Sequence, residues 1–539
     1  MKLYSIRRMA ALASVGALAV IVSATAEAQE PAPTLPVFVD GQAQTVPGFQ
    51  DSTQWIRQEL WVETEFDTDG DGKPDRVHVA VVRPGQTDTE GLKVPVVYES
   101  SPYFAGTAPS GMEYRWNVRH EVGVTPPART LPPPARLRIR PYISNSMVNA
   151  WVPRGFAVVH SEAPGTGLSL GCPTVGGSPE QLAPKAVIDW LNGRAKGFTS
   201  PDGNEAVVAD WSTGKVGMTG TSYNGTIPLA AATTGVDGLE VIIPVSANTS
   251  YYRYYRANGL VRHPGGWLGE DIDFLYDFVN SGDPDRRDYC NATIRDGEMA
   301  AGRDRRTGDY NEFWAGRDLQ NELDGVKAAT LMAHGLSDWN VMPDHSTRVY
   351  EELRARGVPV GLYLHQGGHG GPPPMEMMNR WFTRYLYGID NGVENGPRSW
   401  IVREGAERTD PTPYADYPNP EASPVRLYLG SGGEQTGELT TSSAPGARME
   451  TLVDNFSFSG ATLARSEWTN HRLLYATPEL TDSVHLSGTP RITVRLASSK
   501  PAANLTVWLV SLPWTEERRR GSRVIPGRGG MITRAWADL

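Results

Sequence analysis

Ser222 stands in the segment Gly217-Met-Thr-Gly-Thr-Ser-Tyr-Asn-Gly225, which has the composition of a tight turn between a strand and a helix. Strand-like residues precede this turn, and small apolar residues follow it. A free serine hydroxyl is a weak nucleophile, but a turn of this kind exposes the oxygen and aims backbone N–H groups at the charge that develops on a substrate. The segment therefore predicts that Ser222 is the nucleophile of an acyl-transfer reaction.

A second serine, Ser169, fits the nucleophile motif G-x-S-x-G more literally, because the second glycine after Ser222 comes one residue late. Ser169 lies in a loop rich in glycine and proline, with Cys172-Pro173 where the following helix should begin. We expect no helix to begin there, so the context favours Ser222. The alternative for Ser222 is a small residue in a glycine turn.

A serine nucleophile needs a histidine to take its proton and an acid to orient that histidine. In a parallel sheet covered by helices, these residues follow the serine in the order acid, then histidine, each in a loop after a strand. Asp338 follows the strand-like run that ends at Ala333, and His369 follows the run that ends at Leu364. Ser222, Asp338 and His369 are therefore predicted to form a catalytic triad.

Two residues compete for the roles of acid and base. His365 ends its strand and is expected to be a packed structural residue, whereas glycines around His369 leave that ring access to a neighbouring loop. Asp344 is the alternative acid, but we expect it to be the N-cap of a helix. His369 and Asp338 are therefore favoured.

The tetrahedral intermediate of acyl transfer also needs hydrogen-bond donors. The backbone N–H of Tyr223, directly after the nucleophile, is the first expected donor. The second should come from the loop after an early strand, and Ser100-Ser-Pro-Tyr103 follows the predicted strand 94–98. This loop is therefore the candidate for the other half of an oxyanion hole.

The pattern of apolar residues predicts the elements that must position these groups. Residues 53–100 show β alternation, and further strands are predicted at 215–219, 239–245, 328–333 and 359–364, with helices at 184–191, 344–356 and 375–387. Strands that alternate with helices indicate an α/β fold with a mostly parallel sheet covered on both faces.

Two regions depart from this pattern. Residues 250–325 are aromatic and charged and predict a helical cap inserted over the site. From about residue 396 the chain is rich in Pro, Gly, Ser and Thr, with short alternating runs at 425–429, 491–496 and 505–510. This second region predicts a separate all-β sandwich over residues 396–539.

The N-terminus has the pattern of a signal peptide over residues 1–28. Lys2, Arg7 and Arg8 precede an apolar run, and Ala26-Glu-Ala28 is a cleavage site of the A-x-A type. We therefore expect a periplasmic or secreted protein, and Arg7-Arg8 leaves twin-arginine export open. No later stretch reaches the roughly 20 apolar residues of a membrane span, so no membrane association is expected after cleavage.

Charge and cysteine content restrict the partners and cofactors. The 539-residue chain has a formal net charge of −10, which argues against nucleic acid as a partner. An oxidising compartment would allow the only two cysteines, Cys172 and Cys290, to form a disulfide. Two cysteines are too few for a zinc framework, and no metal or other cofactor is predicted.

Residues 67–75 are Asp-Thr-Asp-Gly-Asp-Gly-Lys-Pro-Asp, which matches the start of a calcium-binding loop. Position twelve is His78 instead of the usual glutamate, and predicted strands flank the segment instead of helices. A polar hairpin turn is therefore the favoured interpretation, and calcium binding is the alternative.

Five segments together resemble the Xaa-Pro dipeptidyl-peptidase family, whose wider group includes cocaine esterase and the α-amino acid ester hydrolases. These segments are Gly-Thr-Ser222-Tyr-Asn-Gly, Ser-Pro-Tyr103, Ala186-Val-Ile-Asp-Trp-Leu-Asn-Gly-Arg194, Gly335-Leu-Ser-Asp338-Trp-Asn and Gly-Gly-His369. The resemblance covers nearly all of the chain after residue 28. Its most specific motif is the serine turn with the late glycine and the tyrosine after the serine.

The resemblance implies an α/β-hydrolase core over residues 29–395, a helical cap and a C-terminal jelly roll. It places a tyrosine hydroxyl in the oxyanion hole, which corresponds to Tyr103. It also implies that Glu270 resembles the family's anchor for a free amine, with Tyr254 lining the same pocket; a charge at a helix start is the alternative for Glu270. The chain stops at Leu539, earlier than family members usually do, so an incomplete sandwich is expected.

These observations together lead to the expectation of an exported serine exopeptidase. The resemblance implies that it releases N-terminal dipeptides whose second residue is proline, through an acyl-enzyme. The alternative with the same machinery is an esterase or acylase acting on small acyl or α-amino acid esters. A non-catalytic binding protein is a third possibility, against which the ordered triad argues, and a homo-oligomer is left open.

Overall fold

The computed structural model describes residues 34–538 apart from 119–123, 125–126, 139–141, 266, 444–448, 502, 515–516, 521–522 and 527–529. The predicted signal peptide, residues 1–28, lies outside the described residues. Within the described ranges, no helix combines the length and the apolar character that a membrane crossing requires.

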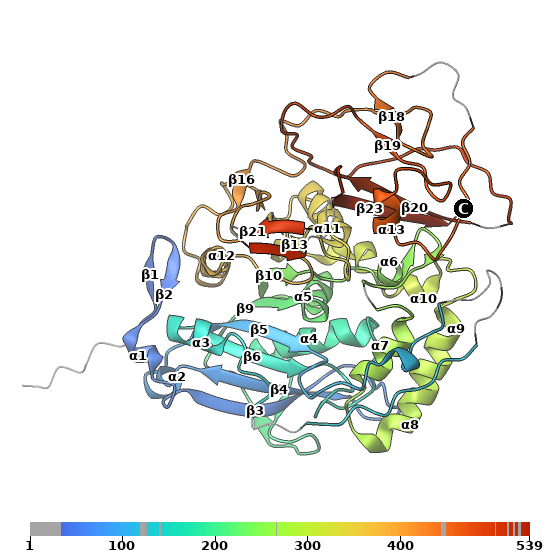
Figure 1. Ribbon diagram of the computed structural model, residues 1–539. Helices are drawn as coiled ribbons and strands as arrows, with labels where there is room; N and C mark the ends of the chain where they lie inside the picture. Colours follow the sequence, from blue (N-terminus) through green and yellow to red (C-terminus); the bar gives the residue numbers. More distant parts are fainter. Residues whose placement is uncertain are drawn as a thin grey trace, which may run out of the picture. The chain divides into compact units, whose positions relative to one another are not determined.

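A central sheet of twelve strands dominates the structure, in the order β16-β15-β14-β13-β10-β9-β5-β6-β4-β3-β7-β8 (Figure 1). Its strands are β3 (Ile56–Glu63), β4 (Arg76–Arg83), β5 (Val94–Ser101), β6 (Ala157–Glu162), β7 (Gly197–Phe198), β8 (Ala206–Val207), β9 (Ser212–Thr221), β10 (Leu239–Val245), β13 (Ala329–Gly335), β14 (Val360–His365), β15 (Ser399–Ile401) and β16 (Thr412–Tyr414). The strands from β6 to β15 run parallel, and the strands at both edges pair antiparallel. The α/β fold expected from the sequence is thus confirmed.

Helices cover both faces of this sheet because alternate residues of each strand point to opposite faces. In β5, Val96 and Tyr98 belong to one apolar core, whereas Val97 belongs to the other. The first core packs against α4 (Ser178–Leu191), α5 (Tyr223–Thr233) and α11 (Asp344–Ala355), and the second packs against α3 (Val148–Trp151) and α12 (Met375–Tyr387). The remaining short elements before β7 are β1 (Val37–Val39), β2 (Gln42–Gln44), α1 (Pro47–Gln50), α2 (Gln86–Thr89) and the 3-10 helices η1 (Met112–Tyr114) and η2 (Val152–Arg154).

The cap lies between β10 and β13 in the chain. It is mainly helical, as predicted, and consists of α6 (Tyr251–Tyr255), a hairpin of β11 (Arg256–Ala257) and β12 (Leu260–Val261), α7 (Ile272–Val279), η3 (Pro284–Arg286), α8 (Arg287–Cys290), the π-helix η4 (Asn291–Met299), α9 (Ala300–Gly302), α10 (Glu312–Ala315), η5 (Leu319–Asn321) and η6 (Leu323–Gly325). The small hairpin was not expected, because two-residue strands carry too little pattern to be seen in a sequence.

Residues 64–75 form the turn of the β3–β4 hairpin, in agreement with the favoured interpretation of this segment. Carboxylate oxygens of Asp67, Asp69 and Asp71 lie within 4.8 Å of one another. The Arg286 guanidinium of the cap forms ion pairs with Asp69 and, at 3.6 Å, with Asp71. This turn therefore contacts the cap through an arginine, and calcium binding stays a prediction.

A disulfide joins Cys172, in the loop after β6, to Cys290 of the cap, across a sequence separation of 118 residues. Cross-linking of a loop of this length removes conformational entropy from the unfolded chain, and about 2–5 kcal/mol of stability is typically lost when a native disulfide is removed. We expect the double variant Cys172→Ser, Cys290→Ser to unfold at a lower temperature and urea concentration than the oxidised wild type. Reductant should lower the wild-type midpoint and leave that of the double variant unchanged. Equal midpoints for both proteins would contradict this prediction.

The C-terminal region is mostly β, but its details differ from the prediction. It contains β17 (Tyr428–Leu429), β18 (Gly437–Thr440), α13 (Gly460–Arg465), β19 (Tyr475–Ala476), β20 (Asn504–Val510), β21 (Glu517–Arg520), β22 (Arg523–Pro526) and β23 (Met531–Asp538). These strands form one three-stranded and two two-stranded sheets. A jelly roll therefore remains a prediction.

One strand predicted for this region was wrong. Residues 491–496 form no strand, and the side chains of Ile492, Val494 and Leu496 are exposed. Strand preference reflects packing on a half-buried pleated surface, and these residues lack such a surface. Strands β15 and β16 extend the central sheet to Tyr414, past the predicted boundary at residue 396. Three-residue strands leave no periodic pattern that could reveal them.

Candidate active site

Ser222 lies in a strained turn between β9 and α5, with φ 66° and ψ −126°. A positive φ is unfavourable for a residue with a Cβ atom and persists only where the surrounding structure imposes it. Helix α5 and strand β10 approach each other closely beside this turn, because a Cβ atom at Gly225 would lie 2.7 Å from the Val245 carbonyl oxygen of β10. The same strand accepts the Ser222 N–H at its Val245 oxygen, at 2.8 Å. This geometry is that of a nucleophile elbow.

Asp338 and His369 meet at the carboxyl ends of β13 and β14. His369 Nδ1 lies 2.7 Å from Asp338 Oδ2, and Asp338 Oδ1 accepts the backbone N–H groups of Asn340 and Val341 at 2.8 and 3.1 Å. With Nδ1 donating to the carboxylate, Nε2 is the ring nitrogen left to accept a proton. The His369 loop also reaches the end of β9, because a Cβ atom at Gly370 would lie 3.5 Å from the side chain of Thr221.

A second histidine, His334, also contacts the Asp338 carboxylate. Its Nε2 lies 3.3 Å from Asp338 Oδ2, and its Nδ1 lies 2.7 Å from Ser346 Oγ. Burial alone would raise the pKa of Asp338, but the hydrogen bonds from His334 and His369 outweigh it and hold the pKa well below its usual value. The carboxylate therefore stays ionised. This role of His334 was not predicted, because no sequence motif indicates it.

The alternative candidates have structural roles. Ser169 is buried, donates its hydroxyl to the Glu162 carbonyl at 2.8 Å, and accepts the His78 N–H at 2.9 Å. His365 is also buried, and its ring nitrogens lie 2.9 Å from the backbone of Gly367 and Gly370. Ser169 and His365 are thus engaged within the fold.

Asp344 is not the N-cap that was predicted. It is the first residue of α11, and the N-cap position belongs to Pro343. Proline fits the start of a helix because its fixed φ is helical and its missing N–H would have no partner there. Asp344 instead accepts a hydrogen bond from Arg348 one turn later, at 3.2 Å.

Tyr103 and Tyr223, the two expected oxyanion donors, both line the pocket that contains Ser222, and their rings pack edge to face at 5.8 Å between centroids. Tyr223 is the first residue of α5, so its N–H belongs to the first turn, whose N–H groups have no partner within the helix. Burial, together with the nearby Glu270 and Glu180 carboxylates, raises the pKa of the Tyr103 hydroxyl. The Tyr103 hydroxyl therefore remains protonated and able to donate.

The Tyr223 side chain is held by a buried glutamate that was not predicted from the sequence. Its hydroxyl donates to both carboxylate oxygens of Glu180, at 2.8 and 2.7 Å, and Glu180 also accepts the N–H of Gly176 at 2.8 Å. Burial raises the pKa of Glu180. Glu180 thus fixes the residue whose N–H is the expected oxyanion donor. A single glutamate in a helix gives no sequence signal of this contact.

The pocket at Ser222 has a volume of about 150 Å³ and mainly aromatic walls. The walls include Tyr103, Tyr223, Tyr251, Tyr254, Phe274 and Phe278. Tyr254, predicted to line this pocket, donates its hydroxyl to Asn340 Oδ1 at 2.6 Å, which links the cap to the loop of Asp338. Asn340 itself was not predicted as a pocket residue.

Glu270, the expected amine anchor, also lines this pocket and is buried. Its carboxylate accepts a hydrogen bond from the Tyr255 hydroxyl at 3.1 Å. Burial raises the pKa of Glu270 to about 7, although the hydrogen bond from Tyr255 and the charge of Arg115 lower it. Across the described parts of the chain, no arginine, lysine or histidine nitrogen comes within 4.0 Å of this carboxylate. Glu270 is therefore a buried carboxylate without an ion-pair partner.

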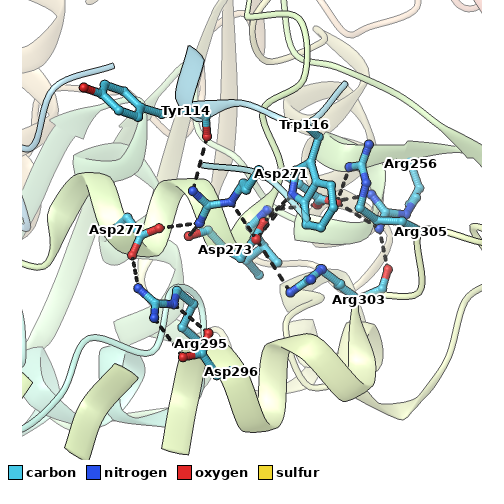
Figure 2. Close-up of polar contacts among 12 residues, drawn as sticks. Tyr114, Trp116, Arg256, Asp271, Asp273, Asp277, Arg295, Asp296, Arg303 and Arg305 are labelled. Carbon is cyan, nitrogen blue, oxygen red and sulfur yellow. Dashed lines mark hydrogen bonds and ion pairs between the residues drawn. The ribbon is translucent and has the colours of Figure 1, made fainter. Parts of the chain in front are cut away.

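The neighbouring carboxylate, Asp271, has a different environment. Its oxygens accept hydrogen bonds from Arg256 at 3.2 and 3.3 Å and from Arg305 at 2.6 Å, as Figure 2 shows. Burial opposes ionisation, but the two guanidinium groups outweigh it and hold the pKa of Asp271 well below its usual value. Of these two adjacent carboxylates, only Glu270 can offer an uncompensated charge to a ligand.

Charged contacts hold the wall of the pocket that α7 forms. Asp273 accepts a hydrogen bond from Trp116 Nε1 at 3.0 Å, and Asp277 accepts one from Arg295 at 2.8 Å (Figure 2). Asp273 also accepts a hydrogen bond from Arg129 Nε at 2.9 Å. The same helix contributes Phe274, Leu275 and Phe278 to the pocket. These ion pairs are almost fully buried, so they fix the helix that carries the apolar wall.

Two family models match this chain. Residues 69–371 match the model of the X-Pro dipeptidyl-peptidase (S15 family), and residues 391–539 match that of the X-Pro dipeptidyl-peptidase C-terminal non-catalytic domain. A relative from Rhodopirellula baltica named "Putative Xaa-Pro dipeptidyl-peptidase" is 62% identical over 97% of this chain and 83% of its own length. The "Xaa-Pro dipeptidyl-peptidase" of Ligilactobacillus salivarius is 33% identical over 94% of this chain and 68% of its own. A solved α-amino acid ester hydrolase covers 79% of this chain and 67% of its own, with 16% identity and a TM-score of 0.45.

Proposed function

Because this chain belongs to the X-Pro dipeptidyl-peptidase family (S15), we propose that it is an exported exopeptidase that releases N-terminal Xaa-Pro dipeptides through Ser222, Asp338 and His369. The family establishes a serine hydrolase that acts on peptides. The catalytic triad, the covalent intermediate and export go beyond what the family establishes, and we propose them here. Export rests on residues 1–28, and N-terminal sequencing of the protein from the extracytoplasmic fraction tests it, because the mature chain should begin at Gln29.

The proposed reaction proceeds in two steps. His369 Nε2 accepts the Ser222 proton while Oγ attacks the carbonyl carbon of the substrate proline, and the oxyanion accepts hydrogen bonds from the Tyr223 N–H and the Tyr103 hydroxyl. The C–N bond then breaks, and His369 gives its proton to the leaving amine. Water, activated by the same histidine, hydrolyses the ester and restores the Ser222 hydroxyl. Asp338 remains ionised and orients His369 throughout.

The observation that carries the exopeptidase assignment is the environment of Glu270. A free N-terminal ammonium group placed beside a buried carboxylate without an ion-pair partner would complete an ion pair, whereas an acylated N-terminus would leave that carboxylate unpaired. Glu270 and Ser222 line the same small pocket, so the scissile carbonyl must lie close to the N-terminus of the substrate. The esterase or acylase alternative uses the same groups and differs in its demand for proline.

Three chromogenic substrates test this proposal. We expect Ala-Pro 4-nitroanilide to be cleaved, and its N-acetyl derivative to react at least about a hundred-fold more slowly, because a buried charge left unpaired costs several kcal/mol. A 4-nitrophenyl ester of a simple acyl group serves as the third substrate and reports the triad alone. Rapid cleavage of the acetylated anilide without cleavage of the free one would contradict an aminopeptidase. Hydrolysis of the ester alone would favour the esterase alternative.

A further inference from the structure

The C-terminal domain reaches the loop that carries Asp338. Arg534, on β23, donates a hydrogen bond from Nη2 to the main-chain carbonyl oxygen of Asp338 at 2.9 Å and contacts Met342 Sδ at 3.1 Å. Its guanidinium carbon lies 3.4 Å from the centroid of the Trp339 ring. One arginine thus contacts the backbone at Asp338 and the side chain of the next residue.

Other residues of the two-stranded β20–β23 sheet, called the ribbon below, also contact the catalytic domain. Trp508 of β20 packs against Trp339 with 6.2 Å between ring centroids. The cap residue Asn258 donates to the carbonyl of Trp536, on β23, at 2.7 Å. The ribbon therefore contacts both the loop of Asp338 and the cap.

Three consecutive carbonyls of this loop accept hydrogen bonds from arginines. Arg534 holds the carbonyl of Asp338, and Nη2 of Arg262, from the cap, lies 3.2 and 3.3 Å from the carbonyls of Trp339 and Asn340. Charged donors form stronger hydrogen bonds than neutral ones. The backbone that bears the Asp338 carboxylate is thus fixed from two directions, by the cap and by the C-terminal domain.

We propose that Arg534 is a positioning residue, through which the C-terminal domain orients the Asp338 carboxylate and hence His369. This inference rests on the proposed function, because it needs Asp338 as the acid of the triad. Asp338 lies in a loop, so its backbone conformation is not fixed by a helix or a strand. A displacement of about 1 Å in a catalytic group can lower the rate about a hundred-fold. A domain whose family model is described as non-catalytic would then contribute directly to the geometry of the site.

The first test compares variants at position 534 with Ala-Pro 4-nitroanilide. We expect Arg534→Ala to lower kcat about ten- to a hundred-fold with KM nearly unchanged, because the substrate pocket stays intact while the triad loses its orientation. Arg534→Lys should recover part of kcat, since lysine can donate to the carbonyl but cannot also lie flat on the Trp339 ring. Arg491→Ala, an exposed arginine of the same domain, is the matched control and should leave both constants unchanged.

A double-mutant cycle separates positioning from a general structural role. If Arg534 acts through Asp338, then Arg534→Ala should change kcat less than about two-fold in an Asp338→Asn background. Equal fold losses in both backgrounds, or an unchanged kcat in Arg534→Ala beside a slow Asp338→Asn, would overturn the inference alone. An unchanged rate in Asp338→Asn, with both anilide and ester, would overturn the triad and the inference with it. If Arg534→Ala does not fold, the same cycle with Arg534→Lys decides.

Discussion

Replacement of Ser222 by alanine is expected to lower kcat by about 10⁴-fold or more while the protein remains folded. The hydroxyl is the only group that can form the proposed acyl-enzyme, and water cannot take its place in the strained turn between β9 and α5 with the same orientation. Alanine at this position keeps a Cβ atom and the backbone of the elbow. The residual rate should come from binding and from the donors of Tyr103 and Tyr223.

The matched control for this prediction is Ser169→Ala, which removes the serine of the more literal motif. A fluorophosphonate probe should label the wild type and Ser169→Ala and should fail to label Ser222→Ala. Ser169 is buried and hydrogen-bonded to Glu162 and His78. This variant therefore tests whether the literal motif or the structural environment identifies the nucleophile. Labelling that persists in Ser222→Ala would show that another residue is the nucleophile.

Glu270→Gln is expected to lower kcat/KM for Ala-Pro 4-nitroanilide by about 10²–10³-fold. The substitution keeps the size of the side chain and its contact with the Tyr255 hydroxyl, and it removes only the charge that the substrate ammonium group would meet. Hydrolysis of the 4-nitrophenyl ester, which has no ammonium group, should change less than about two-fold. An equal loss for both substrates would show that Glu270 supports the fold of the pocket and does not anchor an amine.

The pH dependence of the same reaction tests the role of the Glu270 charge independently. Burial raises its pKa to about 7, so the carboxyl is neutral below this pH and becomes an ammonium acceptor above it. We expect the ratio of kcat/KM for the free dipeptidyl anilide to that for the ester to rise as the pH increases through 7. Both substrates use the same triad, so the ratio isolates the contribution of the site that meets the ammonium group. The rise should be absent in Glu270→Gln.

The stability of Glu270→Gln provides the control for folding. The pKa of Glu270 is higher in the folded protein than in the unfolded chain, so its contribution to stability is fully present below the unfolded pKa and is lost as the pH rises through 7. Glutamine does not titrate and avoids this loss. At pH 8 the variant should therefore melt at the same temperature as the wild type or higher.

Strands and site residues could be predicted where neighbouring residues in the sequence determine them. Buried strands such as 239–245 and 359–364 are continuous apolar runs, and the order of Ser222, Asp338 and His369 follows from where such strands end. The elbow was also predictable, because its glycines and small residues are required by the close backbone contacts that the structure shows. These features depend on residues within a few positions of one another.

Contacts between distant parts of the chain could not be predicted in the same way. Arg534 and Asp338 are 196 residues apart, and the Tyr223 hydroxyl meets Glu180 across 43 residues. Neither glutamate nor arginine carries a motif at these positions, since their partners are set by how the strands and helices pack. The strand predicted at 491–496 was wrong for a related reason. Alternation shows which side chains a strand would bury, but not whether another layer of the structure covers those side chains.

The most direct test of the central claim is covalent labelling with the diphenyl phosphonate of the dipeptide Ala-Pro, followed by peptide mapping. Attack of the nucleophile on phosphorus forms a stable P–O bond and releases phenol, so the adduct records both the nucleophile and the accepted dipeptide. We predict one adduct, on Ser222, and labelling by the N-acetylated reagent at least about a hundred-fold slower, because that reagent offers no ammonium group to Glu270. An adduct on any other residue, or equal rates for the free and acetylated reagents, would contradict the proposed function.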